Sequence, residues 1–145
     1  AVAISADGNT LLFSGSKMNS VWAFTRSLGV WQQQGNKITV TDNVGSSGFG
    51  SSIALSADGN TLAVGGNYDN YYYGATWVFT RSGTTWSQQG SKLVGSNAVP
   101  NGSNLSQGWS VSLSADGNTW TIDKITSHFN EYLKFNIEWK TKSNK

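Results

Sequence analysis

Short runs of apolar and small residues flank one six-residue phrase, Ser-Ala-Asp-Gly-Asn-Thr, which occurs at Ser5–Thr10, Ser56–Thr61 and Ser114–Thr119. An Asp-Gly pair between two such runs is the strongest short-range signal of a β-hairpin. The favoured turn needs positive φ at both central residues, which Gly adopts freely and Asp tolerates. We therefore expect each phrase to be a hairpin turn with a strand on either side.

The strands around the second phrase have one bulky and one small face. A two-residue loop pairs Leu55 with Leu62 and Ile53 with Val64, and these four side chains share a face. The opposite face carries small side chains, those of Ala54, Ser56, Thr61 and Ala63. Neither face is charged, which predicts a sheet buried on both sides, as when blades stack face to face.

A second hairpin follows the first in each full unit. Three phrases recur at an offset of 55 residues: Phe24–Ser27 with Phe79–Ser82, Trp31–Gly35 with Trp86–Gly90, and Lys37 with Lys92. The turn phrase recurs at offsets of 51 and 58 residues, close to the ~40–50 residues of a four-stranded propeller blade. We expect the second turns at residues 26–30 and 81–85.

The repeat sets the expected domain boundaries. We place propeller-type repeats at residues 1–121, with unit 1 at 1–44, unit 2 at 45–104 and the start of unit 3 at 105–121. Residues 122–145 form a divergent C-terminal segment that carries five of the ten Lys and Arg residues and is basic. This segment is expected to supply a closing strand.

The strand expected in that segment is Leu133–Lys140, where apolar and polar residues alternate. Ser127–Leu133 could instead form a short helical turn, because Ile125, Phe129 and Leu133 have helical spacing. For residues 122–132, helix and strand therefore both stay open.

Residues 48–66 together with 74–81 resemble the FG-GAP type of β-propeller repeat, which also builds the integrin α-subunit head. They are closer still to uncharacterised microbial and giant-virus proteins rich in the string SADGNTLAVGG. The match covers roughly residues 1–121 and implies a fold, while propellers host many unrelated activities. The calcium loops of that family use alternating carboxylates, which are missing here, so the resemblance implies no metal site.

The fold class we predict is all-β, with antiparallel four-stranded propeller-type blades in two full units and an incomplete third. A closed propeller needs at least ~4 blades. Either copies of the chain complete a ring together, or the chain is a piece of something larger. We favour self-association, and so expect a homo-oligomer.

Composition narrows the class of protein. Charged residues make up 12% and there is no Cys, so no disulfide or thiolate metal site is possible. No run approaches the ~18 apolar residues of a membrane span, and the basic surplus of the tail is not the broad face that nucleic acid requires. This composition favours an extracellular or virion-associated protein.

The one unusual cluster of side chains lies between the two hairpins of unit 2. It contains Asn67, Tyr68, Asp69, Asn70, Tyr71, Tyr72 and Tyr73. Aromatic rings beside amides and a carboxylate suit a glycan, whose CH groups stack on rings while polar groups bind its hydroxyls. Tyr-rich loops also form protein contact surfaces, and the cluster could simply be an exposed loop.

Catalytic chemistry finds little support in the sequence. Asp7, Asp58 and Asp116 are explained as turn residues, His128 is the only histidine, and Glu131 and Glu138 lack a supporting motif. We therefore expect no catalytic residues, metal or cofactor. The sequence favours a non-catalytic structural or binding module that acts by self-assembly and protein contact. A lectin-like propeller using residues 67–73 is the alternative, and a polysaccharide-acting enzyme comes last.

Overall fold

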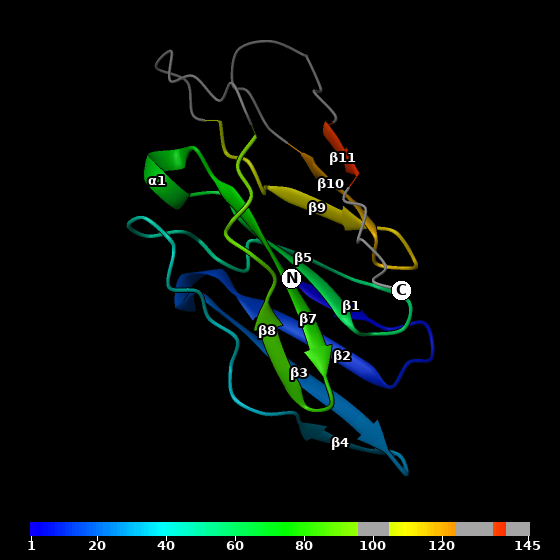
Figure 1. Ribbon diagram of the computed structural model, residues 1–145. Coiled ribbons are helices and arrows are strands. Elements are labelled where there is room, and N and C mark those ends of the chain that lie inside the picture. Colours follow the sequence, from blue (N-terminus) through cyan, green and yellow to red (C-terminus); the bar gives the residue numbers. More distant parts are fainter. Residues whose placement is uncertain (96–104, 124–134, 139–145) are drawn as a thin grey trace.

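The computed structural model describes residues 1–95, 105–123 and 135–138 and contains three antiparallel sheets that fan out one beside another (Figure 1). The first sheet runs β1 (Val2–Ile4), β2 (Thr10–Gly15), β3 (Ser20–Ser27), β4 (Val30–Gln33). The second runs β5 (Ser52–Leu55), β6 (Thr61–Gly66), β7 (Ala75–Ser82), β8 (Thr85–Gln88). The third runs β9 (Ser110–Leu113), β10 (Thr119–Asp123), β11 (Phe135–Glu138).

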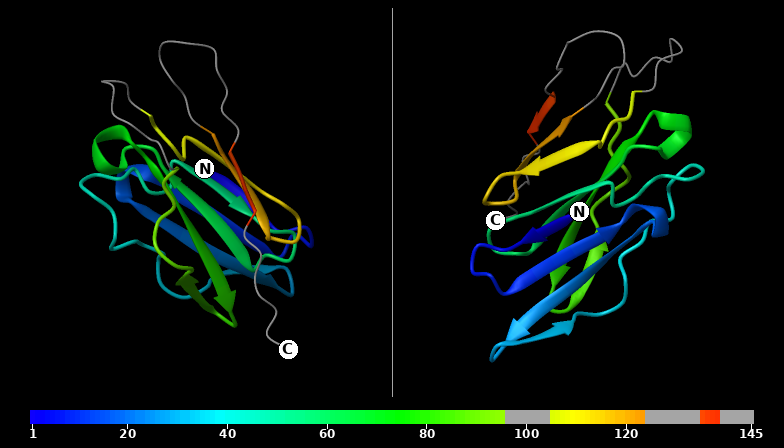
Figure 2. Two further views of the ribbon diagram at one scale, coloured as in Figure 1. Left: turned by 45° about the horizontal axis from the view of Figure 1, so that its top comes forward. Right: turned by 180° about the vertical axis from the view of Figure 1, so that it is seen from behind.

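The sheets are arranged as the repeat predicts. The inner strands β1, β5 and β9 are neighbours, and each sheet extends outward from them in chain order (Figure 2). Two four-stranded sheets and a three-stranded third confirm the all-β fold with two full blades and an incomplete one. The expected strand at 133–140 is confirmed for Phe135–Glu138, whereas the alternative helical turn at 127–133 lies outside the described residues.

Two short turns complete the described elements. η1 (Ser16–Met18) links β2 to β3, and α1 (Asp69–Tyr72) lies between β6 and β7. No helix in the described ranges is long and apolar enough to cross a membrane.

The hairpin register is confirmed, but the turn geometry differs from the expected one. Leu55 pairs with Leu62 and Ile53 with Val64. Of the Asp-Gly pair, only Gly59 is left-handed, with φ of 72°. β5 ends at Leu55, before the phrase, and β6 begins at its last residue, Thr61, while side chains of the phrase bind the backbone between them. Ser56 Oγ accepts the Thr61 N–H at 2.9 Å, which closes a wider loop than the two-residue turn we predicted.

The second hairpins turn more tightly than predicted. Ser27 pairs with Val30, and Ser82 with Thr85. Each loop therefore contains two residues, 28–29 or 83–84, in place of the expected 26–30 and 81–85. Gly29 and Gly83 both have positive φ, the conformation that tight hairpin turns need.

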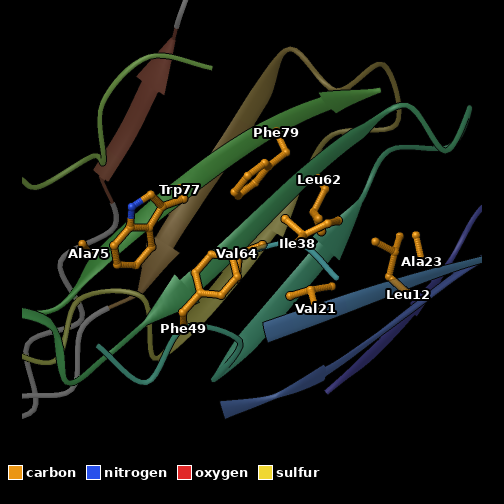
Figure 3. Close-up of a cluster of buried hydrophobic side chains, with 10 residues drawn as sticks. All are labelled: Leu12, Val21, Ala23, Ile38, Phe49, Leu62, Val64, Ala75, Trp77 and Phe79. Atoms are coloured by element: carbon orange, nitrogen blue, oxygen red, sulfur yellow. The ribbon is translucent and has the colours of Figure 1, made fainter. Parts of the chain in front are cut away.

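The main core lies between the first two sheets (Figure 3). It joins the small face of the first sheet to the bulky face of the second: Leu12, Val21 and Ala23 against Leu62, Val64, Trp77 and Phe79, with Ile38 and Phe49 from the links. Phe49 is fully buried and meets the Trp77 ring edge-on, with centroids 5.5 Å apart. Burying a side chain of this size stabilises the fold by about 1.5–3 kcal/mol.

Among the described residues, no sheet covers the bulky face of the first sheet in this way. We call it the open face, made of Val2, Ile4, Leu11, Phe13, Trp22 and Phe24. Val2 is 67% exposed and Phe13 is 37% exposed, although Phe13 stacks on Trp22 at 5.1 Å. The positions of Phe13 and Trp22 correspond in the second sheet to Val64 and Trp77, which are both 0% exposed. The same face is thus buried in one blade and exposed in the other.

Candidate functional site

Three tyrosines of the predicted cluster lie at the surface around a small cleft. Tyr68, Tyr71 and Tyr72 are 43%, 85% and 47% exposed. The cleft has a volume of about 250 Å³, and its wall is completed by Val44, Gly45 and Ser46. Tyr68 and Tyr72 meet edge to face, with centroids 5.2 Å apart. An aromatic-lined hollow of this kind can take a flat apolar or sugar-like group.

The backbone that carries the tyrosines is unusual. Asn70, Tyr71 and Tyr72 have φ of 47°, 55° and 68°, so α1 is a left-handed turn and not a right-handed helix. For residues with a Cβ this costs roughly 1–2 kcal/mol each. The turn is held from outside, because the Tyr72 carbonyl accepts the Ser106 N–H at 2.7 Å. Such strain is kept where surrounding contacts determine it.

A buried ion pair anchors the loop from below. The Asp69 carboxylate is fully buried and lies 2.5 Å from the Lys92 ammonium. Its other oxygen accepts the Val44 N–H at 2.7 Å. Asp69 therefore connects the loop to the segment that follows β8 and to the link that forms the far wall of the cleft.

The remaining predicted residues lie away from the opening. Asn67 is 3% exposed, and its N–H donates to Ser51 Oγ at 3.4 Å. Asn70 and Tyr73 are partly buried, and neither lines the cleft. The structure thus brings three of the seven predicted residues together at the surface. The polar groups beside them are tyrosine hydroxyls, Ser46 and the backbone, whereas the buried Asn67 and Asp69 are structural supports.

Sequence reasoning missed the second wall of the cleft, Val44 to Ser46. These residues precede the tyrosines by more than twenty positions and have no motif of their own. They reach the loop because the Asp69 carboxylate and the Asn70 N–H bind the Val44 backbone and the Tyr68 N–H donates to the Ser47 carbonyl. No local signal in the sequence could have indicated that contact.

The three turn carboxylates act within their own turns. Asp58 accepts the Ser56 hydroxyl at 2.5 Å and the Asn60 N–H at 2.9 Å. These hydrogen bonds favour the ionised form and lower the pKa of Asp58. The same arrangement lowers the pKa of Asp7 and of Asp116. The interpretation as turn residues is confirmed by this geometry.

A fourth carboxylate ties the first link to the second sheet. Asp42 accepts the Trp77 indole N–H at 2.7 Å, the Lys92 N–H at 2.9 Å and the Gln88 amide at 3.1 Å. Burial alone would raise the pKa of Asp42, but the three donated hydrogen bonds outweigh it and lower the pKa. Asp42 is therefore a structural clamp between the blades.

Further candidates remain apart or undescribed. Within residues 1–95, 105–123 and 135–138, no three His, Cys, Asp or Glu side chains form a group that could hold a metal ion. His128 and Glu131 lie outside the described residues, and Glu138 belongs to β11. A wider groove of about 520 Å³ runs between residues 35–41 and β8.

No protein-family model and no curated protein matches the chain. Among solved structures it is similar to hydrazine synthase from Kuenenia stuttgartiensis, with 17% identity and a TM-score of 0.52 over 95% of this chain and 35% of that one. A Bacteroides fragilis protein proposed to be a 6-phosphogluconolactonase is 14% identical with a TM-score of 0.53, and the match covers 95% of this chain and 38% of that one. TolB from Acinetobacter baumannii is 8% identical with a TM-score of 0.50, and the match covers 99% of this chain and 30% of that one.

These neighbours have β-propeller-like folds, so the chain is a β-propeller-type module. It spans only about a third of the length of each of them. At such low identity the likeness concerns the fold alone. The similarity to FG-GAP repeats stays a resemblance, because no family model supports it.

Proposed function

We propose that the chain is a non-catalytic binding module made of propeller blades, which acts by self-association and protein contact through its open face. The observation that carries this is the difference between two equivalent faces. Val64 of the second sheet is completely buried under the first sheet, while Phe13 at the same position of the first sheet is 37% exposed. A surface built to be covered by a blade is thus available to a partner.

The energy available at this surface is substantial. A Phe side chain buries about 150–250 Å², so covering the exposed part of Phe13 removes roughly 70 Å² from water. At ~25 cal/mol per Å² this contributes about 2 kcal/mol. Val2 and Ile4, which are 67% and 56% exposed, add to it. Exposed apolar patches of this kind mark interaction sites.

Five of the eight carboxylates in the chain support a non-catalytic role. Asp7, Asp58 and Asp116 are bound within their turns, Asp42 accepts three hydrogen bonds, and Asp69 pairs with a lysine. Acid–base catalysis needs a carboxyl group that is free to exchange a proton with a substrate. Each of these five groups already has a structural task.

The test is the solution mass of three forms of the chain. Val2→Ser with Ile4→Ser removes apolar surface from the open face, and Leu28→Ser makes the same kind of change at a fully exposed position in the β3–β4 turn. We expect the double variant to weaken association at least about tenfold, equal to ~1.4 kcal/mol, and Leu28→Ser to leave it unchanged. An equal effect of both, or no association of the unaltered chain, would contradict the proposal.

A second candidate function, carbohydrate binding at the cleft, is favoured by the exposed rings of Tyr68, Tyr71 and Tyr72 on a backbone held rigid by Asp69. Preorganised rings lose little entropy on binding. Glycan binding that Tyr71→Ala and Tyr72→Ala abolish, and that Trp31→Ala on β4 leaves intact, would support it. Binding to no glycan on a broad array would exclude it.

A further inference from the structure

The three Ser-Ala-Asp-Gly-Asn-Thr turns form a ladder that joins the blades. The Ala6 N–H donates to the Ala57 carbonyl at 2.9 Å, and the Ala57 N–H donates to the Ala115 carbonyl at 2.9 Å. The first and second turns thus each donate one backbone hydrogen bond to the turn that follows. The phrase that closes every hairpin also sets the spacing between neighbouring blades.

Side chains fit the same junctions. A Cβ added to Gly59 would lie 3.0 Å from Thr10 Oγ1, and one added to Gly117 would lie 2.7 Å from Thr61 Oγ1. The glycines of the second and third turns are therefore seated against the threonine of the preceding turn, with the serine of that turn beside them. A Cβ would force a shift at Gly117 and make a tight contact at Gly59, so both junctions favour glycine for contact as well as for its positive φ.

The ladder has an open side at each end. Thr10 is 5% exposed because the second turn covers it, whereas Thr119, at the equivalent position, is exposed. At the other end, a Cβ on Gly8 would have only Arg26 Nη2 within 4 Å, at 3.9 Å. Among the described residues, no hydrogen bond uses the Ala6 carbonyl or the Ala115 N–H. One end thus offers a backbone acceptor and a glycine, and the other offers the matching N–H and threonine.

We propose that two copies of the chain join head to tail, with the Ser5–Thr10 turn of each copy seated on the Ser114–Thr119 turn of the other. The Ala115 N–H of one copy donates to the Ala6 carbonyl of the next, and Gly8 rests on Ser114 and Thr119. This rests on the proposed self-association and names its partner, a second copy, together with its register. The contact continues the interface that already joins the three blades.

The blade faces behind the turns match as well. The open face of one copy meets the small face of the third sheet, where Ser110 and Ser112 are exposed. This repeats the bulky-against-small packing seen between the first two sheets. A head-to-tail contact closes into a ring when its rotation allows. Closed propellers have ~4–8 blades. Two copies of the three described sheets give six blades, which lies within that range.

Substitutions at the two ends test the register. Gly8→Asn keeps a residue that tolerates left-handed φ but fills the seat, and Thr119→Lys blocks the opposite side. Gly29→Asn is the matched control, since Gly29 has φ of 81° and nothing within 4 Å. We call Gly8→Asn and Thr119→Lys the end variants. We expect each of them alone to raise the dissociation constant of the dimer at least about tenfold, and the control to leave this constant unchanged.

Mixing the two end variants gives the sharpest result. In a head-to-tail pair of Gly8→Asn with Thr119→Lys, one junction carries both changes and the other is unaltered, so dimer returns in the mixture. A face-to-face dimer has no unaltered junction and would not be restored. Failure of restoration, or unchanged association of the end variants, overturns the register while the proposed function stands. A monomeric unaltered chain contradicts both.

Cross-linking gives an independent readout that needs no disruptive change. The chain contains no cysteine, so Ala6→Cys and Ala115→Cys can be introduced in separate copies. Ala6→Cys with Ala57→Cys in one chain reproduces a junction whose geometry is known and sets the reference yield. We expect the mixture of single variants to form a disulfide-linked dimer in excess of either variant alone. Equal yields in the mixture and in the separate samples would overturn the proposal.

Discussion

The ion pair beneath the tyrosine loop leads to a quantitative prediction with an internal control. Lys92 and Lys37 occupy equivalent positions of the two units, but among the described residues Lys92 alone of the two meets a buried carboxylate. Lys92→Met therefore leaves the Asp69 charge buried with the Val44 N–H as its remaining donor. Lys37→Met removes the same charge from an exposed site.

The magnitude follows from the burial of the pair. Removing one partner of a buried salt bridge typically costs 3–5 kcal/mol. The Lys92 side chain is 19% exposed and that of Asp69 is 1% exposed, so some water reaches the site and the lower end applies, about 3 kcal/mol. For a chain of this size such a loss lowers Tm by roughly 6–12 °C. Lys37→Met should stay within about 0.5 kcal/mol, as surface changes do.

The assay is urea unfolding followed by tryptophan fluorescence for both variants and the unaltered chain. Adding Asp69→Asn to Lys92→Met removes the uncompensated charge and should recover part of the lost free energy of unfolding. Equal stability of Lys92→Met and Lys37→Met would refute the reasoning, because the buried carboxylate would then not depend on its lysine.

Three further predictions concern the blades themselves. Phe49→Ala empties the space between the first two sheets and should lower the free energy of unfolding by about 3–5 kcal/mol in a denaturant titration. Gly65→Ala places a Cβ on the Gly108 carbonyl and should cost at least about 1–3 kcal/mol in the same assay. The pKa of Asp58 is lower in the folded state than the ordinary value of 3.8, so its stabilisation is complete above that value and is lost as pH falls through the folded pKa. The urea concentration at the unfolding midpoint should therefore decrease when the pH is lowered below about 4. In Asp58→Asn this decrease should be smaller.

The fold could be predicted because its determinants are local. Alternation around Leu55 and Leu62 set both the hairpin register and the faces of the sheet, and these agree with the structure. The turn itself was predicted less well. The Ser56 hydroxyl and the Asp58 carboxylate take over backbone bonding, which widens the loop and leaves only glycine left-handed.

The cleft and the ladder could not be predicted from local patterns. The tyrosines stood out by composition, but whether Asp69 faces solvent or Lys92 depends on the packing of the second sheet. The contact of Ala6 with Ala57 joins residues 51 positions apart. The repeat indicated that the turns are equivalent, while their direct contact follows from the angle between blades.

The mass of the unaltered chain in solution tests the central claim most directly. We expect sedimentation equilibrium to give twice the chain mass of 15.6 kDa at micromolar concentration, with dissociation on dilution. A mass of 15.6 kDa at every concentration would show that the open face and the open turns are not covered by a second copy.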